Sequence, residues 1–274
     1  MTISGLCPEA SEAFRISNSV NSERYITISV DDGSAQDLRA ADLLDQYGLQ
    51  ATFYIPAVNP ERPVMPVGQI RELSGRFEIG SHTYNHQALG SLPDEQAWTE
   101  IRDGKKWLED LLGETAASFC YPRGKFNRRT PALVKRAGFI GGRTCHFNVH
   151  AFPHDPFLWG VSTHACDHSQ LNQVRHAALE RNWMGIQNFF SVYKAATNWQ
   201  THFFHGLRHV EQHGGIAHLY FHGWEIDELG QWEQLSSVLK SVAQSGLTSI
   251  TNGALFSLWG EGCGPSHSRL VKTY

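Results

Sequence analysis

Short apolar runs rich in β-branched and aromatic residues alternate along the chain with segments of helical apolar spacing. The runs predict strands at residues 25–30, 51–55, 77–80, 118–121, 139–144, 158–163, 216–221 and 247–251. The helical spacing predicts helices at residues 35–47, 91–112, 130–138, 201–213 and 232–242. Strands and helices in this alternation predict a parallel sheet with helical crossovers.

Polar residues gather at or just beyond the carboxyl ends of the predicted strands. These residues are Asp31, Asp32, His82, Arg123, Arg143, Thr163 and His222. In a barrel of parallel strands those ends converge on one face, where active sites are built. The pattern therefore favours a distorted (β/α) barrel of seven or eight parallel strands. Since the chain has no internal repeat and no linker, we expect one domain over residues 1–274.

The charge, the cysteines and the distribution of apolar residues argue against several classes of function. The 274 residues carry a formal net charge of -4 and no run of Lys or Arg, so nothing favours nucleic acid as a partner. The five cysteines are scattered and form no Cys-x-x-Cys pair, which argues against a disulfide framework and against a cysteine zinc site. Residues 1–20 lack the basic start and apolar stretch of a signal peptide, and no apolar run is long enough for a transmembrane segment. The sequence given therefore predicts a cytoplasmic protein; an exported protein from which the signal had been removed would show the same pattern.

Two short motifs carry residues suited to metal chemistry. Asp31-Asp32-Gly33 ends a strand, so one carboxylate could bind a metal while the other acts as a base; a helix-capping turn is the alternative. His82 and His86 are four residues apart, which on a helical turn would bring both rings to one side, as a zinc site requires. A structural histidine pair is the alternative in a chain with fifteen histidines.

Three further segments follow in order. Tyr121-Pro122-Arg123-Gly124 is a turn at the end of a strand, Asp155 and Trp159 are four residues apart, and a buried strand ends in Leu219-Tyr220-Phe221-His222. The five segments, spread over residues 25–250, resemble the motifs of the NodB-like polysaccharide deacetylases, carbohydrate esterase family 4. The resemblance implies a NodB-type barrel and a hydrolase that removes N-acetyl groups from an amino-sugar oligosaccharide or polysaccharide, releasing acetate.

The resemblance also implies a role for each residue. Asp32, His82 and His86 would hold a divalent ion, zinc in the first place, with cobalt or nickel as alternatives. Asp31 would act as the base and His222 as the acid.

Supporting roles follow in the same way. Asp155 and Trp159 would orient His222. Tyr121, Pro122 and Arg123 would support the site or meet the substrate, and a backbone N–H near Arg123 would hold the oxyanion.

The third motif departs from the family pattern. Cys120 stands where the family has an arginine that orients the catalytic aspartate, and Arg123 stands where the family has Phe or Tyr. We predict that Arg143, at the end of the next strand, contacts Asp31 instead, with Arg123 at the rim as the competing candidate. A surface ion pair is the alternative for Arg143.

Other functions stay open at this point. The same scaffold could serve a small-molecule amidase or an inactive glycan-binding protein, although the intact Asp31, Asp32, His82, His86 and His222 argue against an inactive protein. Trp224-Glu225, directly after His222, could contact substrate or anchor a loop.

Overall fold

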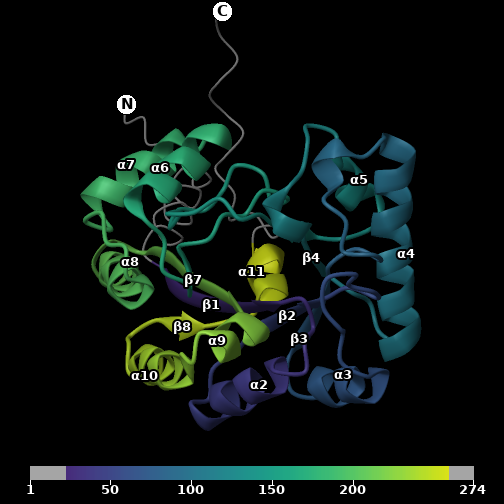
Figure 1. Cartoon of the computed structure of the whole chain (residues 1–274), viewed down its shortest axis with the longest axis horizontal. Helices are drawn as coiled ribbons and strands as arrows, with labels where there is room; N and C mark the ends of the chain where they lie inside the picture. Colours follow the sequence, from purple (N-terminus) through teal and green to yellow (C-terminus); the bar gives the residue numbers. More distant parts are fainter. Residues whose placement is uncertain (1–22, 259–274) are drawn as a thin grey trace, which may run out of the picture.

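A curled sheet of eight strands, all paired in parallel, forms the centre of the computed structural model, which describes residues 23–258 (Figure 1). The strands are β1 (Arg24–Asp31), β2 (Thr52–Ile55), β3 (Glu78–Ser81), β4 (Ser118–Cys120), β5 (Gly141–Arg143), β6 (Thr163–His164), β7 (Gly215–His222) and β8 (Thr248–Ser249). Their order is β5-β4-β3-β2-β1-β7-β6, and β8 pairs with the start of β1. The parallel curled sheet confirms the predicted fold class.

Ten α-helices accompany this sheet among the described residues, and all but α11 lie around it in Figure 1. They are α2 (Asp37–Gln46), α3 (Val67–Ser74), α4 (Asp94–Leu112), α5 (Thr130–Arg136), α6 (Gln170–Leu179), α7 (Trp183–Ser191), α8 (Trp199–His213), α9 (Gly223–Glu228), α10 (Trp232–Ala243) and α11 (Asn252–Leu258). The apolar spacing predicted α2, α4, α5, α8 and α10 and missed the others. Within residues 23–258, no helix is long and apolar enough to cross a membrane.

The chain between β5 and β6 nearly closes the barrel. Arg143 and Trp159 form an isolated parallel bridge, in which the Thr144 N–H donates to the Trp159 carbonyl at 2.7 Å, and β6 then pairs with β7. The strand predicted at 158–163 is therefore wrong in extent. Val161 donates to the His146 carbonyl at 2.8 Å, so this stretch bonds mainly to a loop, and a regular ladder begins only at Thr163.

Strand β1 is buried on both faces, which explains its dense apolar sequence. Ile26, Ile28 and Val30 belong to the core that packs against the helices. The alternate positions face the barrel interior, where Ser29 Oγ lies 2.9 Å from His218 Nε2. The interior is therefore partly polar below the carboxyl ends of the strands.

Helix α11 covers the opposite, amino-terminal end of the barrel, and it lies inside the ring of elements in Figure 1. Its first N–H, of Asn252, donates to Thr52 Oγ1 at 2.9 Å, and the next, of Gly253, donates to Glu78 Oε2 at 2.9 Å. Thr52 and Glu78 are the first residues of β2 and β3. The carboxyl ends of the strands are left as the face on which a site can form.

One carboxylate is buried without a cationic partner. Asp37, in the first turn of α2, is fully buried and accepts hydrogen bonds from Ser34 Oγ at 2.8 Å and from the Gly223 N–H at 3.1 Å. No Lys or Arg of residues 23–258 forms a salt bridge with it. Burial raises the pKa of Asp37 to about 8, because the charged form loses its hydration.

We expect Asp37→Asn to stabilise the protein increasingly as pH rises. The folded state keeps the proton that the unfolded chain releases near pH 4, so the wild type loses about 1.4 kcal/mol per pH unit between about pH 4 and the folded pKa near 8. The amide has no such cost. Melting temperatures at pH 5, 6, 7 and 8 check this: the gap between variant and wild type should widen with pH. A constant gap would contradict a protonated Asp37.

Candidate active site

The carboxyl end of β1 carries two adjacent buried carboxylates with different surroundings. Asp31 is the last residue of the strand, and Asp32 follows it with a φ of 81°. Gly33 continues the turn at φ 66°, and a Cβ at this position would approach Ile55 Cγ2 to 2.7 Å. This turn therefore requires glycine and directs the two carboxylates to different partners.

Arg143 is the partner of Asp31. Its Nη2 donates to both carboxylate oxygens, and its side chain is fully buried. The contact predicted between Arg143 and Asp31 is confirmed. Burial alone would raise the pKa of Asp31, but the guanidinium, together with the nearby His82, holds that pKa below its usual value. Asp31 is therefore ionised at neutral pH.

The register of the sheet explains how Arg143 can take the role of the arginine that the family has at the position of Cys120. Cys120 on β4 and Arg143 on β5 are direct parallel neighbours. The Cys120 thiol lies 3.8 Å from Asp31 Oδ2, so position 120 does face the carboxylate. The guanidinium reaches the same carboxylate from the neighbouring strand, between the rings of Tyr54 at 5.4 Å and Tyr220 at 4.8 Å.

Asp32 lies against the two histidines of the second motif. His86 Nε2 is 3.1 Å and His82 Nε2 is 3.7 Å from Asp32 Oδ1, and one ligand atom of each residue lies within 4.8 Å of the others. All three side chains are buried. The Trp224 indole N–H donates to the other oxygen of Asp32 at 3.0 Å, so Oδ1 stays directed toward the histidines.

The two histidines converge through an irregular loop rather than the predicted helical turn. Thr83 and His86 adopt φ values of 66° and 55°, which bend the chain back after β3. Helix α4 holds this loop. Glu100 accepts hydrogen bonds from the Asn85 N–H and side-chain amide, both at 2.8 Å, and a Cβ on Gly104 would meet the Thr83 carbonyl carbon at 2.6 Å.

This cluster fits a divalent cation. His82 Nδ1 lies 2.9 Å from the Cys120 carbonyl and donates to it, which leaves the lone pair of Nε2 facing Asp32. Burial lowers the pKa of His82 to about 4, so the imidazole is neutral and can act as a ligand. Two imidazole nitrogens and one carboxylate oxygen form a donor set of the kind found in catalytic zinc sites with an open position. Asp32, His82 and His86 would hold the ion.

His222 lies beside the two carboxylates. It ends β7 and is the direct register neighbour of Asp31, and its Nε2 is 4.0 Å from Asp32 Oδ2. Its Nδ1 lies 3.1 Å from Glu225 Oε2, one turn further in α9. Burial lowers the pKa of His222, but the hydrogen bond to Glu225 and the nearby carboxylates outweigh burial and raise it.

The residues expected to orient His222, Asp155 and Trp159, have other contacts in the structure. Asp155 instead accepts a hydrogen bond from the Phe157 N–H at 2.9 Å, and the Trp159 ring packs against Phe256 with centroids 5.3 Å apart. The residue that contacts His222 is Glu225. The signal in the sequence is its position three residues after His222, which brings it to the same side of a helical turn.

The third motif splits into a core part and a rim part. Tyr121 is fully buried, and its hydroxyl donates to the Phe157 carbonyl at 3.0 Å, so its side chain supports the barrel wall. Pro122 begins a 3-10 turn, η2 (Pro122–Gly124), in which Arg123 has a φ of 56°. The Arg123 side chain is exposed and pairs with Glu61, in keeping with the predicted rim position and away from Asp31.

Part of the chain is similar to known proteins. Residues 18–141 match the polysaccharide deacetylase family. A peptidoglycan-N-acetylglucosamine deacetylase of Bacillus cereus is 34% identical over 137 residues, which are 49% of this chain and 62% of that relative. The chain thus spans less than two thirds of the relative's length.

Two solved structures share the fold over most of the chain. The Xyl-CE4 domain of a multidomain xylanase from the hindgut metagenome of Trinervitermes trinervoides has a TM-score of 0.53 at 17% identity, covering 87% of this chain and 92% of that one. A family 4 acetyl xylan esterase from Clostridium thermocellum, solved with a cobalt ion, also has a TM-score of 0.53 at 17% identity, covering 90% and 97%. By its sequence match over residues 18–141 and by its fold, the chain resembles the NodB-like polysaccharide deacetylases of carbohydrate esterase family 4.

Proposed function

We propose that the protein is a metal-dependent hydrolase that removes N-acetyl groups from an amino-sugar glycan and releases acetate. The observation that carries the proposal is the placement of the Asp31–Arg143 pair beside the Asp32, His82 and His86 cluster. Zinc is the ion that this donor set favours, with cobalt or nickel as alternatives. A bound divalent ion would supply Lewis acidity, which acidifies water and polarises a carbonyl group.

Asp31 is suited to act as the general base. It is ionised, buried and held in place by Arg143 through two contacts to one guanidinium nitrogen. The proton of the attacking water would pass to its carboxylate. A backbone N–H at Arg123, in the turn that follows β4, would donate to the carbonyl oxygen as negative charge develops there.

His222 is suited to protonate the leaving amine. Its raised pKa keeps a larger share of the imidazole protonated near neutral pH, and Glu225 fixes Nδ1–H so that Nε2 faces Asp32. Its register position next to Asp31 brings acid and base to neighbouring strand ends. The products of the step are acetate and a free amino sugar.

The test is acetate release by apoprotein and by zinc- or cobalt-loaded protein. Three substrates separate the classes: acetylated chito-oligosaccharides, O-acetylated xylan and a small non-sugar acetamide. We expect metal-dependent acetate release from the chito-oligosaccharides. Turnover of the small acetamide alone would favour an amidase, xylan alone an O-acetyl esterase, and binding without turnover an inactive glycan-binding protein.

We expect Glu225→Gln to lower kcat by about 10-fold or more while the ion at Asp32, His82 and His86 stays bound. The amide keeps the size of the side chain but loses the charge that raises the pKa of His222. Because the acid must carry a proton, the alkaline limb of the rate profile should move to lower pH. A pH–rate profile with metal analysis checks this, and Glu228→Gln, which loses only the contact with Arg62, is the matched control. If the alkaline limb did not shift, Glu225 would not be the residue that raises the pKa of His222 and positions it.

A further inference from the structure

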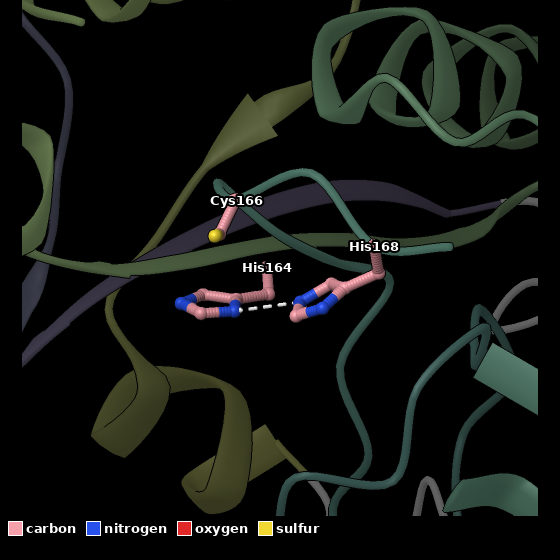
Figure 2. A group of neighbouring side chains, drawn as sticks. All are labelled: His164, Cys166 and His168. Carbon is pink, nitrogen blue, oxygen red and sulfur yellow. Dashed lines mark hydrogen bonds between the residues drawn. The ribbon is translucent and has the colours of Figure 1, made fainter. Parts of the chain in front are cut away.

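A second group of side chains that could hold a metal ion lies next to Glu225. His164 ends β6, and Cys166 and His168 follow at alternate positions before α6; Figure 2 shows the three side chains turned toward one another. One potential ligand atom of each lies within 4.8 Å of those of the other two. His164 Nδ1 and His168 Nε2 are only 3.0 Å apart.

The backbone of this segment is fixed on both sides of the cluster. The Ala165 N–H donates to the Tyr220 carbonyl at 2.9 Å, and the His168 N–H donates to the Thr197 carbonyl at 3.2 Å. Asp167 Oδ1 accepts from the Trp199 N–H at 2.8 Å, which ties the segment to the start of α8. The backbone that carries the three side chains is therefore held in place by its surroundings before any ion binds.

His164 already has the contacts of a metal-binding imidazole. Its ring stacks on Tyr220 with centroids 4.4 Å apart, and its Nε2 lies 2.8 Å from Glu225 Oε2. With the proton on Nε2, beside the Glu225 carboxylate, the lone pair of Nδ1 faces His168. Imidazole ligands commonly donate their other N–H to a carboxylate, which fixes the tautomer and ring orientation.

The cluster borders a small cavity of the barrel wall. Thr197, Trp199 and His202 also line it. Three protein ligands leave one position of a tetrahedral ion to be filled, and this cavity offers space for a water there.

We propose that His164, Cys166 and His168 bind a second divalent ion, zinc or cobalt, at a site distinct from Asp32, His82 and His86. Two imidazole nitrogens and one thiolate suit these borderline-soft ions. Binding transfers the Cys166 thiol proton to solvent, and the His168 proton moves to Nδ1 so that Nε2 can bind.

The second site is connected to the first. Glu225 Oε2 lies 2.8 Å from His164 Nε2 and 3.1 Å from His222 Nδ1, so the same oxygen contacts both imidazoles. An ion on His164 fixes its tautomer and ring, and through Glu225 it fixes His222. The second ion is thus a positioning element for the group proposed as the acid.

Metal stoichiometry tests the proposal without any assay of turnover. Apoprotein reconstituted with zinc should bind two ions per chain. His168→Ala and Cys166→Ser should each bind one ion, and Asp32→Ala should also bind one. The site does not rest on the proposed function, since Asp32→Ala removes the first ion and leaves the second. Unfolding curves of the chelator-treated variants show whether each one folds.

Spectroscopy identifies the ligand. Cobalt-loaded protein should show thiolate-to-cobalt charge-transfer absorption that Cys166→Ser abolishes and that Asp32→Ala retains. Cys120→Ser is the matched control, because this thiol lies beside the first site and is a second candidate source of such a band. Zinc should also slow alkylation of Cys166, with Cys145 as the internal reference. One zinc per wild-type chain, or alkylation of Cys166 unchanged by zinc, would overturn the proposal.

Discussion

Asp31→Asn should lose about 10²–10⁴-fold in kcat while it binds the first metal ion as the wild type does. The amide matches the carboxylate in size but cannot take the proton of the attacking water. The ligand atoms of Asp32, His82 and His86 remain in place, so the metal content should not change. Steady-state acetate release together with elemental analysis of the reconstituted variant measures both quantities.

The control separates the base from a general loss of charge. Asp42→Asn makes the same chemical change at an exposed ion pair with Arg76, and it should leave kcat within about twofold. Because Asp31→Asn also leaves the Arg143 guanidinium without its carboxylate, both variants are assayed well below their melting temperatures. Turnover near the wild-type level in Asp31→Asn would assign the proton transfer to another group.

The sequence predicted those parts of the site that follow from strand position. Asp31, Asp32 and His222 end strands or follow them directly, and parallel strands bring such ends to one face. The contact of Arg143 with Asp31 was predictable for the same reason, since Cys120 and Arg143 hold equivalent places on neighbouring strands.

The local backbone conformation of the site could not be predicted from the sequence. Asp32, Thr83, His86 and Arg123 all have positive φ, as have only four other non-glycine residues within residues 23–258. Side chains disfavour this conformation, so residue type gives no sign of it, and the surrounding contacts enforce it. The hydrogen bonds that Glu100 accepts from the loop after β3 are one such set of contacts. A helical turn was the wrong prediction there because spacing of four residues alone cannot distinguish the two.

Two of the helices that the sequence missed carry apolar residues on more than one side. In α6 and α7, large apolar side chains are exposed, among them Leu171, Leu179, Trp183 and Met184. Amphipathic spacing is the signal used to predict a helix, and it is blurred where apolar residues lie on both sides. Glu225 was missed as the partner of His222 for a related reason: α9 has six residues, too few for a periodic pattern.

We expect Arg143→Met to lower the free energy of unfolding of the apoprotein by about 3–5 kcal/mol, because it leaves the buried Asp31 carboxylate without its partner. In the Asp31→Asn background the same change should cost much less, since no charge is left unpaired. Denaturant unfolding in the presence of a chelator measures the free energy of unfolding of the wild type, both single variants and the double variant. The chelator removes any contribution of bound metal to these values.

Arg76→Met is the matched control, since Arg76 contacts the two surface carboxylates Asp42 and Asp45 at 2.8 and 2.5 Å. Water screens that pair, so its loss should cost about 1 kcal/mol or less. The contrast tests whether burial gives the Arg143 contact its importance: fully buried, the guanidinium and carboxylate have no water to replace either partner. Equal costs for Arg143→Met with and without Asp31→Asn would mean that Arg143 stabilises the barrel by packing between Tyr54 and Tyr220. In that case its position beside Cys120 would not substitute for the family's arginine.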